Sequence, residues 1–368
     1  MELILQTSNG CLTAEICAAA TLLTNYYAKK DIKTSILRCR DIEPNTNNVL
    51  IGIGGIYDYE SMKFDHHQTD FNEKWNNSDI LLSTSGLIWR HFGKEIVEMY
   101  LTANSDEYDN SNNYTVETID ELTNIIYFNL IAEIDANEHG IYSETKLNLT
   151  NLVNCINDTS GNEKKQNENF SKAVTLLGFI FDIFFKKIIS SYFNFPKDLE
   201  ILKNYNLSAP YLIVNEKIPT IFKCLRKIDP DNNVKFVIFK KDDEYNDASK
   251  IEYLIKTRNC PKFTPMIPIL SENILKTKVL QPDDILFVHK AFLNCKTKTL
   301  NTAIEIVFYS LTNYMINEEK KQECKVEINE NEQKEIIKNT GTSKTTFFGI
   351  ISLVSLAVFG VYCYSNKN

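Results

Sequence analysis

An aspartate followed by two adjacent histidines is the part of this sequence best suited to chemistry. The run Asp65-His66-His67 holds two of only five histidines in 368 residues. One imidazole can bind a metal ion while its neighbour, on the other side of the backbone, donates to an anionic substrate. Histidines of a polar loop that face water would explain the tripeptide equally well. The elements around the tripeptide must decide between these two interpretations.

The elements before the tripeptide are typical of an α/β domain. Leu3–Gln6 is a short apolar run that predicts a strand, and Leu12–Ala28 has apolar residues at helical spacing. Thr34–Arg38 and Val49–Ile53 predict two further strands. The second ends at Gly54-Gly55, where an open sheet usually turns over its active edge. The two histidines follow this turn directly.

The rest of the body predicts more helices and then a second, smaller α/β unit. Helices are expected over Ser83–Tyr100, Val116–Asn137 and Asn169–Tyr192. The second unit has short strands and a final helix, expected at Val234–Phe239, Ile251–Ile255, Ile285–His289 and Leu300–Met315. We expect domains over 1–203 and 204–316, with a passage at 204–219 and a polar loop at 157–169.

The C-terminal segment predicts a membrane anchor. Phe347–Tyr364 is eighteen residues without a charge, about 27 Å long as a helix, which is close to the thickness of a bilayer core. A charged linker is expected over 317–344 and the span over 345–364. The N-terminus lacks the pattern of a secretory signal. We therefore expect a tail anchor with the body in the cytosol, at the endoplasmic reticulum or the outer mitochondrial membrane.

Charge and cysteine content exclude some classes of protein. The net charge of -8 argues against a broadly basic nucleic-acid binder, although a local basic groove is compatible with it. Nine scattered cysteines without a C-x-x-C pair favour a reducing compartment over a disulfide framework or a zinc ribbon.

Four motifs in order resemble the melanocyte proliferating gene 1 exonuclease family of the DHH phosphoesterase superfamily. Gly52–Glu73 resembles its pattern DVGG-x-YD, then DHHQ-x-x-FNE. Ser83–Ile96 resembles S-S-A-G-L-V-Y-x-H-F-G-K-E-I, Ala132–Ile141 resembles E-I-D-A-x-D-N-G-I, and Phe287–His289 resembles F-V-H. The resemblance covers about Leu5–Val307. It implies a DHH-type domain with a parallel sheet, a smaller C-terminal domain, and metal-dependent phosphodiester hydrolysis by a 3'-5' exonuclease that acts on RNA.

The resemblance also identifies positions where this sequence departs from the family. The family opens with T-H-x-G-x-F-H-x-D, whose histidines and aspartate are expected metal ligands. Here Ser8 and Thr13 replace the histidines, and Glu15 replaces the aspartate. Gly52 stands where the family has an aspartate expected to bridge two metal ions. Hydroxyls are poor substitutes for imidazole, and glycine has no ligand atom. We therefore expect the first of the two metal sites to be absent.

The groups that remain would serve three roles in the implied site. The metal ligands are Glu15, His66 and Asp135; the catalytic residues are Asp65, which orients a neighbour, and His67; the substrate contacts are His67 and His289. The bound ion would be one manganese or magnesium ion. The alternative is that no ion is bound.

Several of these residues also have a structural explanation. Glu15 near the start of a helix is favoured by the helix dipole without any metal. Asp135 could hold a buried loop by hydrogen bonds. His91 lies on a helix face and is expected to be structural, and His139 next to a glycine is expected at a helix end.

Three hypotheses follow. The first is a membrane-anchored member of the exonuclease family with lost or strongly impaired catalysis, which binds RNA or a nucleotide or acts as a scaffold. The second is a working phosphodiesterase that uses one metal ion. The third is an unrelated α/β interaction module whose histidines are incidental. The family is associated with the nucleus and mitochondria, whereas the tail favours a membrane.

Overall fold

The computed structural model describes residues 2–42, 48–104, 114–142, 147–158, 160–242, 251–258, 282–289 and 294–311. The chain divides into two compact units, unit 1 over Met1–Glu200 and unit 2 over Ile201–Asn368. Both units combine helices with a five-stranded sheet, so the α/β class is confirmed. The predicted linker 317–344 and membrane span 345–364 lie outside the described residues. Within those ranges, no helix has the length and apolar character needed to cross a membrane.

The sheet of unit 1 is parallel except at one edge. Its strand order is β2-β1-β3-β5-β4. The first four strands in this order run parallel, and β4 pairs antiparallel with β5. Their bounds are β1 Glu2–Ser8, β2 Lys33–Cys39, β3 Asn48–Ile51, β4 Tyr57–Asp58 and β5 Lys63–Phe64. Carboxyl ends of parallel strands meet at one edge of a sheet, and this edge carries the loops that position the site.

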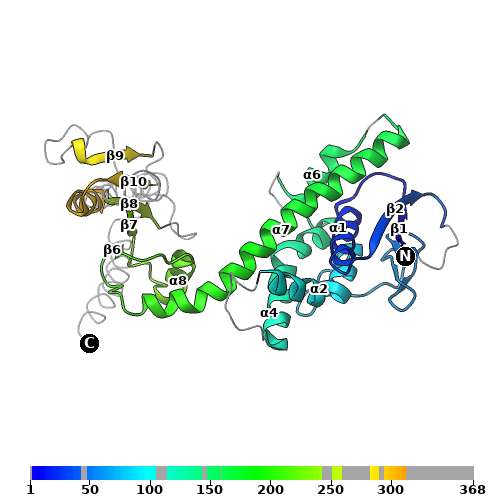
Figure 1. The fold of residues 1–368 in the computed structure, drawn as a ribbon, viewed down its shortest axis with the longest axis horizontal. Coiled ribbons are helices and arrows are strands. Elements are labelled where there is room, and N and C mark those ends of the chain that lie inside the picture. The colour runs from blue at the N-terminus through cyan, green and yellow to red at the C-terminus, as the bar shows by residue number, and fades with distance from the viewer. Residues whose placement is uncertain are drawn as a thin grey trace, which may run out of the picture. The chain divides into compact units, whose positions relative to one another are not determined.

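The helices of unit 1 bury one apolar core against this sheet. Helix α1 lies beside β2 (Figure 1) and also contacts β3. Its small residues Ala18, Ala19 and Ala20 are fully buried, which lets its backbone approach the sheet. The helices are α1 Ala14–Ala28, α2 Thr84–Ala103, α4 Val116–Ile126, a π-helix Tyr127–Ile131, α5 Ala132–Glu138, α6 Leu149–Ile156 and α7 Glu163–Leu202.

Two sequence expectations for these helices need correction. The single helix expected over 116–137 is α4, a π-helix and α5 in succession. The polar loop expected over 157–169 ends earlier, because α7 begins at Glu163. There the side chain of Asn162 accepts a hydrogen bond from the Lys165 amide (3.0 Å), which caps the helix start despite its polar composition.

Unit 2 is built on a mostly antiparallel sheet of order β6-β7-β8-β10-β9. Among its described strands, β6 and β7 pair in parallel and the other neighbours pair antiparallel. Phe236, Ile238 and Ile255 form its core with Val307 from a helix over 300–311. The elements are β6 Tyr211–Val214, α8 Ile221–Ile228, β7 Phe236–Asp242, β8 Ile251–Thr257, a 3-10 turn Pro282–Asp284, β9 Ile285–Val288 and β10 Asn294–Thr297. Sequence analysis missed β6, which lies in the expected passage 204–219, and also α8 and β10.

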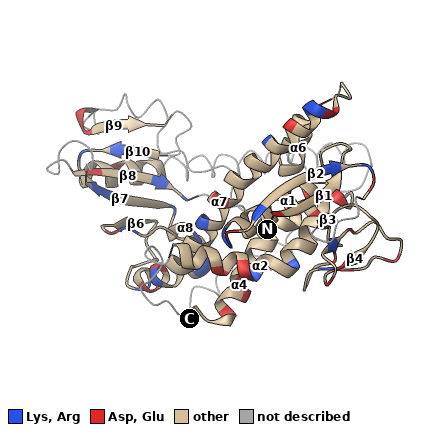
Figure 2. Cartoon of the chain, turned by 45° about the vertical axis from the view of Figure 1, so that its right-hand side comes forward, with Lys and Arg blue, Asp and Glu red and all other residues tan. Residues whose placement is uncertain are grey.

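Charged residues of both signs are interspersed along the elements of unit 1 (Figure 2). Lys30 pairs with Glu95 (2.6 Å), Lys94 with Asp120 (2.6 Å), and Arg90 with Glu73. Such pairing leaves fewer uncompensated cations for contacts to phosphates, in agreement with the acidic composition of the whole chain.

Candidate metal centre

Four side chains of unit 1 converge in the way that a metal site requires. Glu15, His66, His67 and Glu138 each offer one ligand atom, and these four atoms all lie within 4.8 Å of one another. Glu15 lies in the first turn of α1, the histidines follow β5, and Glu138 ends α5. The α1 start and the histidine loop both follow carboxyl ends of parallel strands, which explains how positions about fifty residues apart come together.

Glu15 and His66 form the buried side of this group. Their exposed fractions are 2% and 8%, and Glu15 Oε2 lies 3.4 Å from His66 Nδ1. The Thr84 backbone amide donates to Glu15 Oε2 (3.0 Å), and the Thr84 hydroxyl lies 3.3 Å from His66 Nδ1. The start of α2 therefore holds both side chains in place.

Burial keeps this side of the group uncharged in the absence of a cation. Burial raises the pKa of Glu15, and the nearby carboxylate of Glu138 raises it further. Burial also lowers the pKa of His66 to about 4, with further lowering from His67 and His139. Neutral imidazole is the form that binds metal ions. A divalent cation would supply the positive charge that two neighbouring carboxylates lack.

His67 is oriented by Asp65. The Asp65 carboxylate is 3% exposed, with Oδ1 2.5 Å from His67 Nδ1, and the Gly55 amide donates to Oδ2 (2.7 Å). Burial alone would raise the pKa of Asp65, but the bonds from His67 and Gly55 lower it overall, which keeps this carboxylate ionised. Because Asp65 holds Nδ1, the other ring nitrogen of His67 is the one that can reach a ligand.

Asp135 is not among the four converging residues. It is 0% exposed, and its Oδ1 accepts hydrogen bonds from the Ser83 amide (3.1 Å) and hydroxyl (2.6 Å). Its Oδ2 accepts one from the Tyr127 hydroxyl (2.9 Å). A Cβ atom at Gly86 would lie only 2.5 Å from Oδ2, so that glycine allows the carboxylate to sit against α2. These bonds anchor the start of α2, and a metal-binding role for Asp135 stays a prediction.

Glu138 is the member of the group that sequence analysis missed. It lies three residues after Asp135, on the same short helix. A signal was present, because the pattern E-I-D-A-x-D-N-G-I has a second acidic residue where this chain has Glu138. The sequence analysis assigned the ligand role on this helix to Asp135 instead.

The positions that replace expected ligands are filled in ways that do not fit a second cation. Gly52 has a φ of +60°, and a Cβ there would lie 1.9 Å from Ile16 Cδ1. The Ile16 side chain therefore occupies the space that an aspartate would need. Thr13 precedes α1 at its N-cap, and its buried hydroxyl has no hydrogen-bond partner among the described residues. Ser8 ends β1. Among the residues that the structure describes, one group of ligand atoms could hold a cation.

The other histidines have separate environments. His91 Nε2 lies 2.7 Å from the Tyr57 hydroxyl, and its ring stacks on Tyr59 at 4.0 Å, which is a packing arrangement. The His139 ring lies 5.5 Å from that of His66, beside the group. His289 follows β9 in unit 2, where its amide donates to the Asn294 carbonyl (3.0 Å). Its substrate role stays a prediction.

Comparison with known proteins decides the family. Residues 4–311 match the model of MYG1_exonuc, described as an uncharacterised protein family (UPF0160). The chain belongs to this family. It is 28% identical to the MYG1 protein of Dictyostelium discoideum over 264 residues, which are 65% of this chain and 75% of that protein. It is 30% identical to the MYG1 exonuclease of Homo sapiens over 145 residues, which are 37% of this chain and 35% of that protein. The match thus spans about a third of the human relative.

A solved structure of the exonuclease RecJ bound to manganese overlaps 85% of this MYG1 family member and 89% of its own chain. The identity is 9% and the TM-score is 0.25. An overlap this weak carries no argument about the site. The family match, in contrast, confirms the resemblance read from the four motifs.

Proposed function

We propose that this MYG1 family member binds one divalent cation and a nucleic acid or nucleotide, and that its phosphodiester hydrolysis is strongly reduced. The observation that carries the proposal is the unequal state of the two halves of the site. Four ligand atoms lie within 4.8 Å of one another in one half, while Ile16 fills the place of the expected bridging ligand in the other.

The cation half would be held by Glu15 and His66 from the buried side and by Glu138 from the exposed side. A manganese or magnesium ion bound there would polarise a phosphate oxygen and lower the pKa of a bound water. Thr84 fixes Glu15 before any ion arrives, because its amide already donates to one carboxylate oxygen. His67 and Glu138 are the more exposed members of the group.

His67 is the residue we assign to the phosphate of the ligand. It is exposed, and Asp65 fixes its ring through Nδ1. In the charged form it can donate to a phosphate oxygen and neutralise part of its charge. We place Asp65 as the positioning residue in this pair, because the bond to Gly55 ties it to the turn after β3.

Reduced hydrolysis follows from the missing second cation. In two-metal sites the ions stabilise the attacking and leaving oxygens of the displacement together. A single ion leaves one of these charges without stabilisation. For comparison, losing one hydrogen-bond donor to such a developing charge typically costs about 100- to 1,000-fold in rate.

The test uses the full chain with Mn²⁺ or Mg²⁺ and short RNA and DNA oligomers, with cation binding and product formation measured in parallel. We expect cation binding that His66→Ala and Glu138→Gln abolish, with binding of the oligomer but little turnover. Glu133→Gln on the same helix is the matched control and should change neither readout.

Two results would contradict the proposal. Rapid turnover that both site variants abolish would instead establish an active phosphodiesterase with one metal ion. Absence of any bound cation would remove the basis of the proposal altogether and favour an interaction module.

We also propose that the chain is anchored to a membrane through Phe347–Tyr364, on the strength of that uncharged sequence run alone. The full chain should sediment with membranes of the endoplasmic reticulum or the mitochondrial outer membrane, and a chain that ends at Ser343 should not. Recovery of the full chain in the soluble fraction would contradict this.

A further inference from the structure

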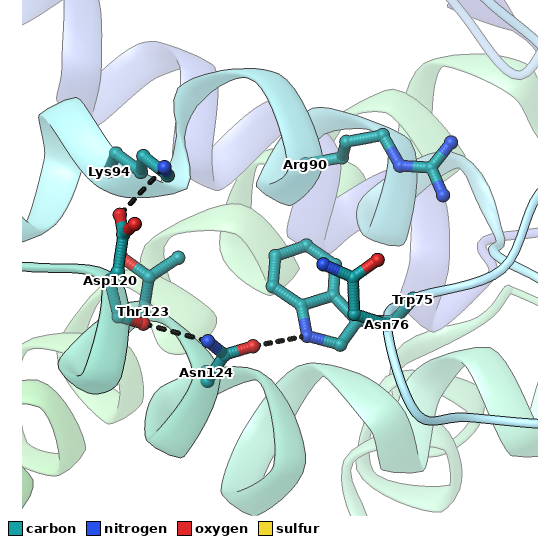
Figure 3. A pocket seen from close by; sticks show the side chains of 7 residues that line it. All are labelled: Trp75, Asn76, Arg90, Lys94, Asp120, Thr123 and Asn124. Carbon is teal, nitrogen blue, oxygen red and sulfur yellow. Dashed lines mark hydrogen bonds and ion pairs between the residues drawn. The ribbon is translucent and has the colours of Figure 1, made fainter. Parts of the chain in front are cut away.

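Unit 1 has a cavity of about 190 Å³ whose lining shares no residue with the metal group. It lies between the loop that carries Trp75 and the helices α2 and α4 (Figure 3). Arg90 and Lys94 line it from α2, and Asp120 and Asn124 line it from α4. Sites for drug-sized ligands measure roughly 300–1,000 Å³. This cavity is therefore suited to one ring system and not to a large ligand.

The indole of Trp75 is a fixed platform in this cavity. It stacks on the Tyr127 ring at 4.3 Å with an interplanar angle of 13°. Its N–H donates to Asn124 Oδ1 (2.8 Å), and the Asn124 amide group donates in turn to the Asp120 carbonyl (2.9 Å). Trp75 is part of the cavity lining and Tyr127 is not. A rigid aromatic ring that borders a cavity suits stacking with a nucleobase.

The two cationic side chains that line the cavity, Arg90 and Lys94, each have an acidic partner. Arg90 pairs with Glu73 and also donates to the Lys74 carbonyl. Lys94 pairs with Asp120 at 2.6 Å, and its side chain is 61% exposed. Exposed pairs are worth only about 0–1 kcal/mol, so Lys94 can exchange its carboxylate partner for a phosphate. This balance favours a ligand with one anionic group over a polyanion.

A second cavity, of about 320 Å³, is lined by residues that bond to neighbours of both regions. It is lined by Gly55 and Gln68, which both bond to Asp65, the partner of His67. It is also lined by Glu73, which pairs with Arg90 at the Trp75 cavity.

We infer that the Trp75 cavity is a nucleotide subsite, in which a nucleobase stacks on the Trp75 indole and a phosphate contacts Lys94. The choice of ligand class rests on the proposed function. The subsite itself consists of other residues and needs no cation at the metal group.

The test titrates the full chain with adenosine 5'-monophosphate in the absence of divalent cations. The chain has two tryptophans, and Trp89 is 0% exposed, so quenching by a stacked base reports on Trp75. We expect saturable quenching by the nucleotide and none by ribose 5-phosphate. Lys94→Ala should weaken nucleotide binding at least about fivefold and leave adenosine binding unchanged. Lys33→Ala removes another exposed ion-pair lysine (77% exposed, paired with Glu2) and should change neither.

Equilibrium dialysis gives a readout that does not depend on the tryptophan signal. Trp75→Phe keeps a smaller ring on Tyr127 and should weaken nucleotide binding, as dialysis measures it. Tight binding of ribose 5-phosphate, or equal losses in the two lysine variants, would overturn the subsite.

His66→Ala separates the two proposals. If that variant loses nucleotide binding, the ligand binds at the metal group and the subsite is overturned. If the unsubstituted chain binds the cation normally but binds no nucleotide, the subsite alone is overturned.

Discussion

Two buried ionisable pairs in this chain, one in each unit, have opposite environments. In unit 2, Asp229 and Arg258 have side chains 1% and 3% exposed and lie 2.5 Å apart. In unit 1, Glu15 and His66 have side chains 2% and 6% exposed and lie 3.4 Å apart. Burial is the same in both, so the difference between them lies in the neighbouring groups.

The Asp229 carboxylate has a full set of donors. The amides of Asn233 and Val234 donate to it at 2.9 Å each, together with Arg258. Burial alone would raise the pKa of Asp229, but these bonds lower it. Arg258 also donates to the Leu225 carbonyl (3.0 Å). This pair joins α8 to the end of β8 and supports the fold.

Glu15 has fewer hydrogen-bond donors than Asp229 and a second carboxylate nearby. One amide, from Thr84, donates to it, while the second carboxylate nearby, Glu138, raises its pKa. A buried acid beside another acid and two imidazoles lacks a compensating charge, which a cation can supply. Buried ionisable groups with complete partners therefore indicate a scaffold, and buried groups that stay uncharged because their partners are incomplete indicate a site.

The largest expected effect of a substitution is in unit 2. Arg258→Met removes the cation and leaves Asp229 buried without its charged partner. We expect a loss of about 3–5 kcal/mol in the free energy of unfolding of unit 2. Both tryptophans lie in unit 1, so hydrogen exchange of the β7 and β8 amides is the measurement.

Lys296→Met is the matched control for that variant. It breaks a more exposed pair with Glu252 (3.2 Å, side chains 41% and 29% exposed), and should cost no more than about 1 kcal/mol. Equal losses in the two variants would contradict the scaffold role of Asp229 and Arg258.

The next effect is stabilisation of unit 1 by a cation. Mn²⁺ at 100 times its dissociation constant should add about 2.7 kcal/mol to the stability of the state that binds it. Thermal unfolding followed by tryptophan fluorescence reports on unit 1. Amide exchange in β7 and β8 should not respond to Mn²⁺, and an equal response there would show that the ion binds without regard to the Glu15 group.

A smaller effect is the loss of stability of unit 2 at acidic pH. Because the folded-state pKa of Asp229 is lowered, its contribution to stability is fully present above the unfolded value of about 3.9. That contribution is lost as the pH falls through the folded value. The free energy of opening of the β7 and β8 amides, obtained from exchange rates corrected for their intrinsic pH dependence, should therefore fall below about pH 4. Arg258→Met should show a weaker pH dependence, and a steeper one would contradict the assignment.

The smallest effect separates folding from cation binding. Glu138→Gln should change the stability of the cation-free chain by less than about 0.5 kcal/mol, the usual limit for surface substitutions, and should remove most of the stabilisation by Mn²⁺. A large loss of stability without Mn²⁺ would show that Glu138 belongs to the scaffold, as Asp229 does.

Periodicity predicted the fold of unit 1 better than that of unit 2. The apolar run before Gly10 and the helix after it correspond to β1 and α1, because burial on a parallel sheet leaves a continuous apolar signal. In unit 2, β6 and β10 have four residues each. Runs that short have no resolvable period, and their pairing comes from partners distant in sequence.

The candidate site shows the same limit. The tripeptide Asp65-His66-His67 could be found from spacing, and Glu15 from a motif. The choice between Asp135 and Glu138 depends on which face of α5 packs against α2. On that face the hydroxyls of Ser83 and Tyr127 donate hydrogen bonds to the carboxylate oxygens of Asp135. The position of the Ile16 side chain beside Gly52 is likewise set by packing alone.

Cation stoichiometry tests the central claim most directly. Full chain loaded with Mn²⁺, freed of excess ion and measured by elemental analysis should hold one ion per chain, and the His66→Ala variant should hold none. Two ions per chain, or one ion that the variant retains, would contradict the account.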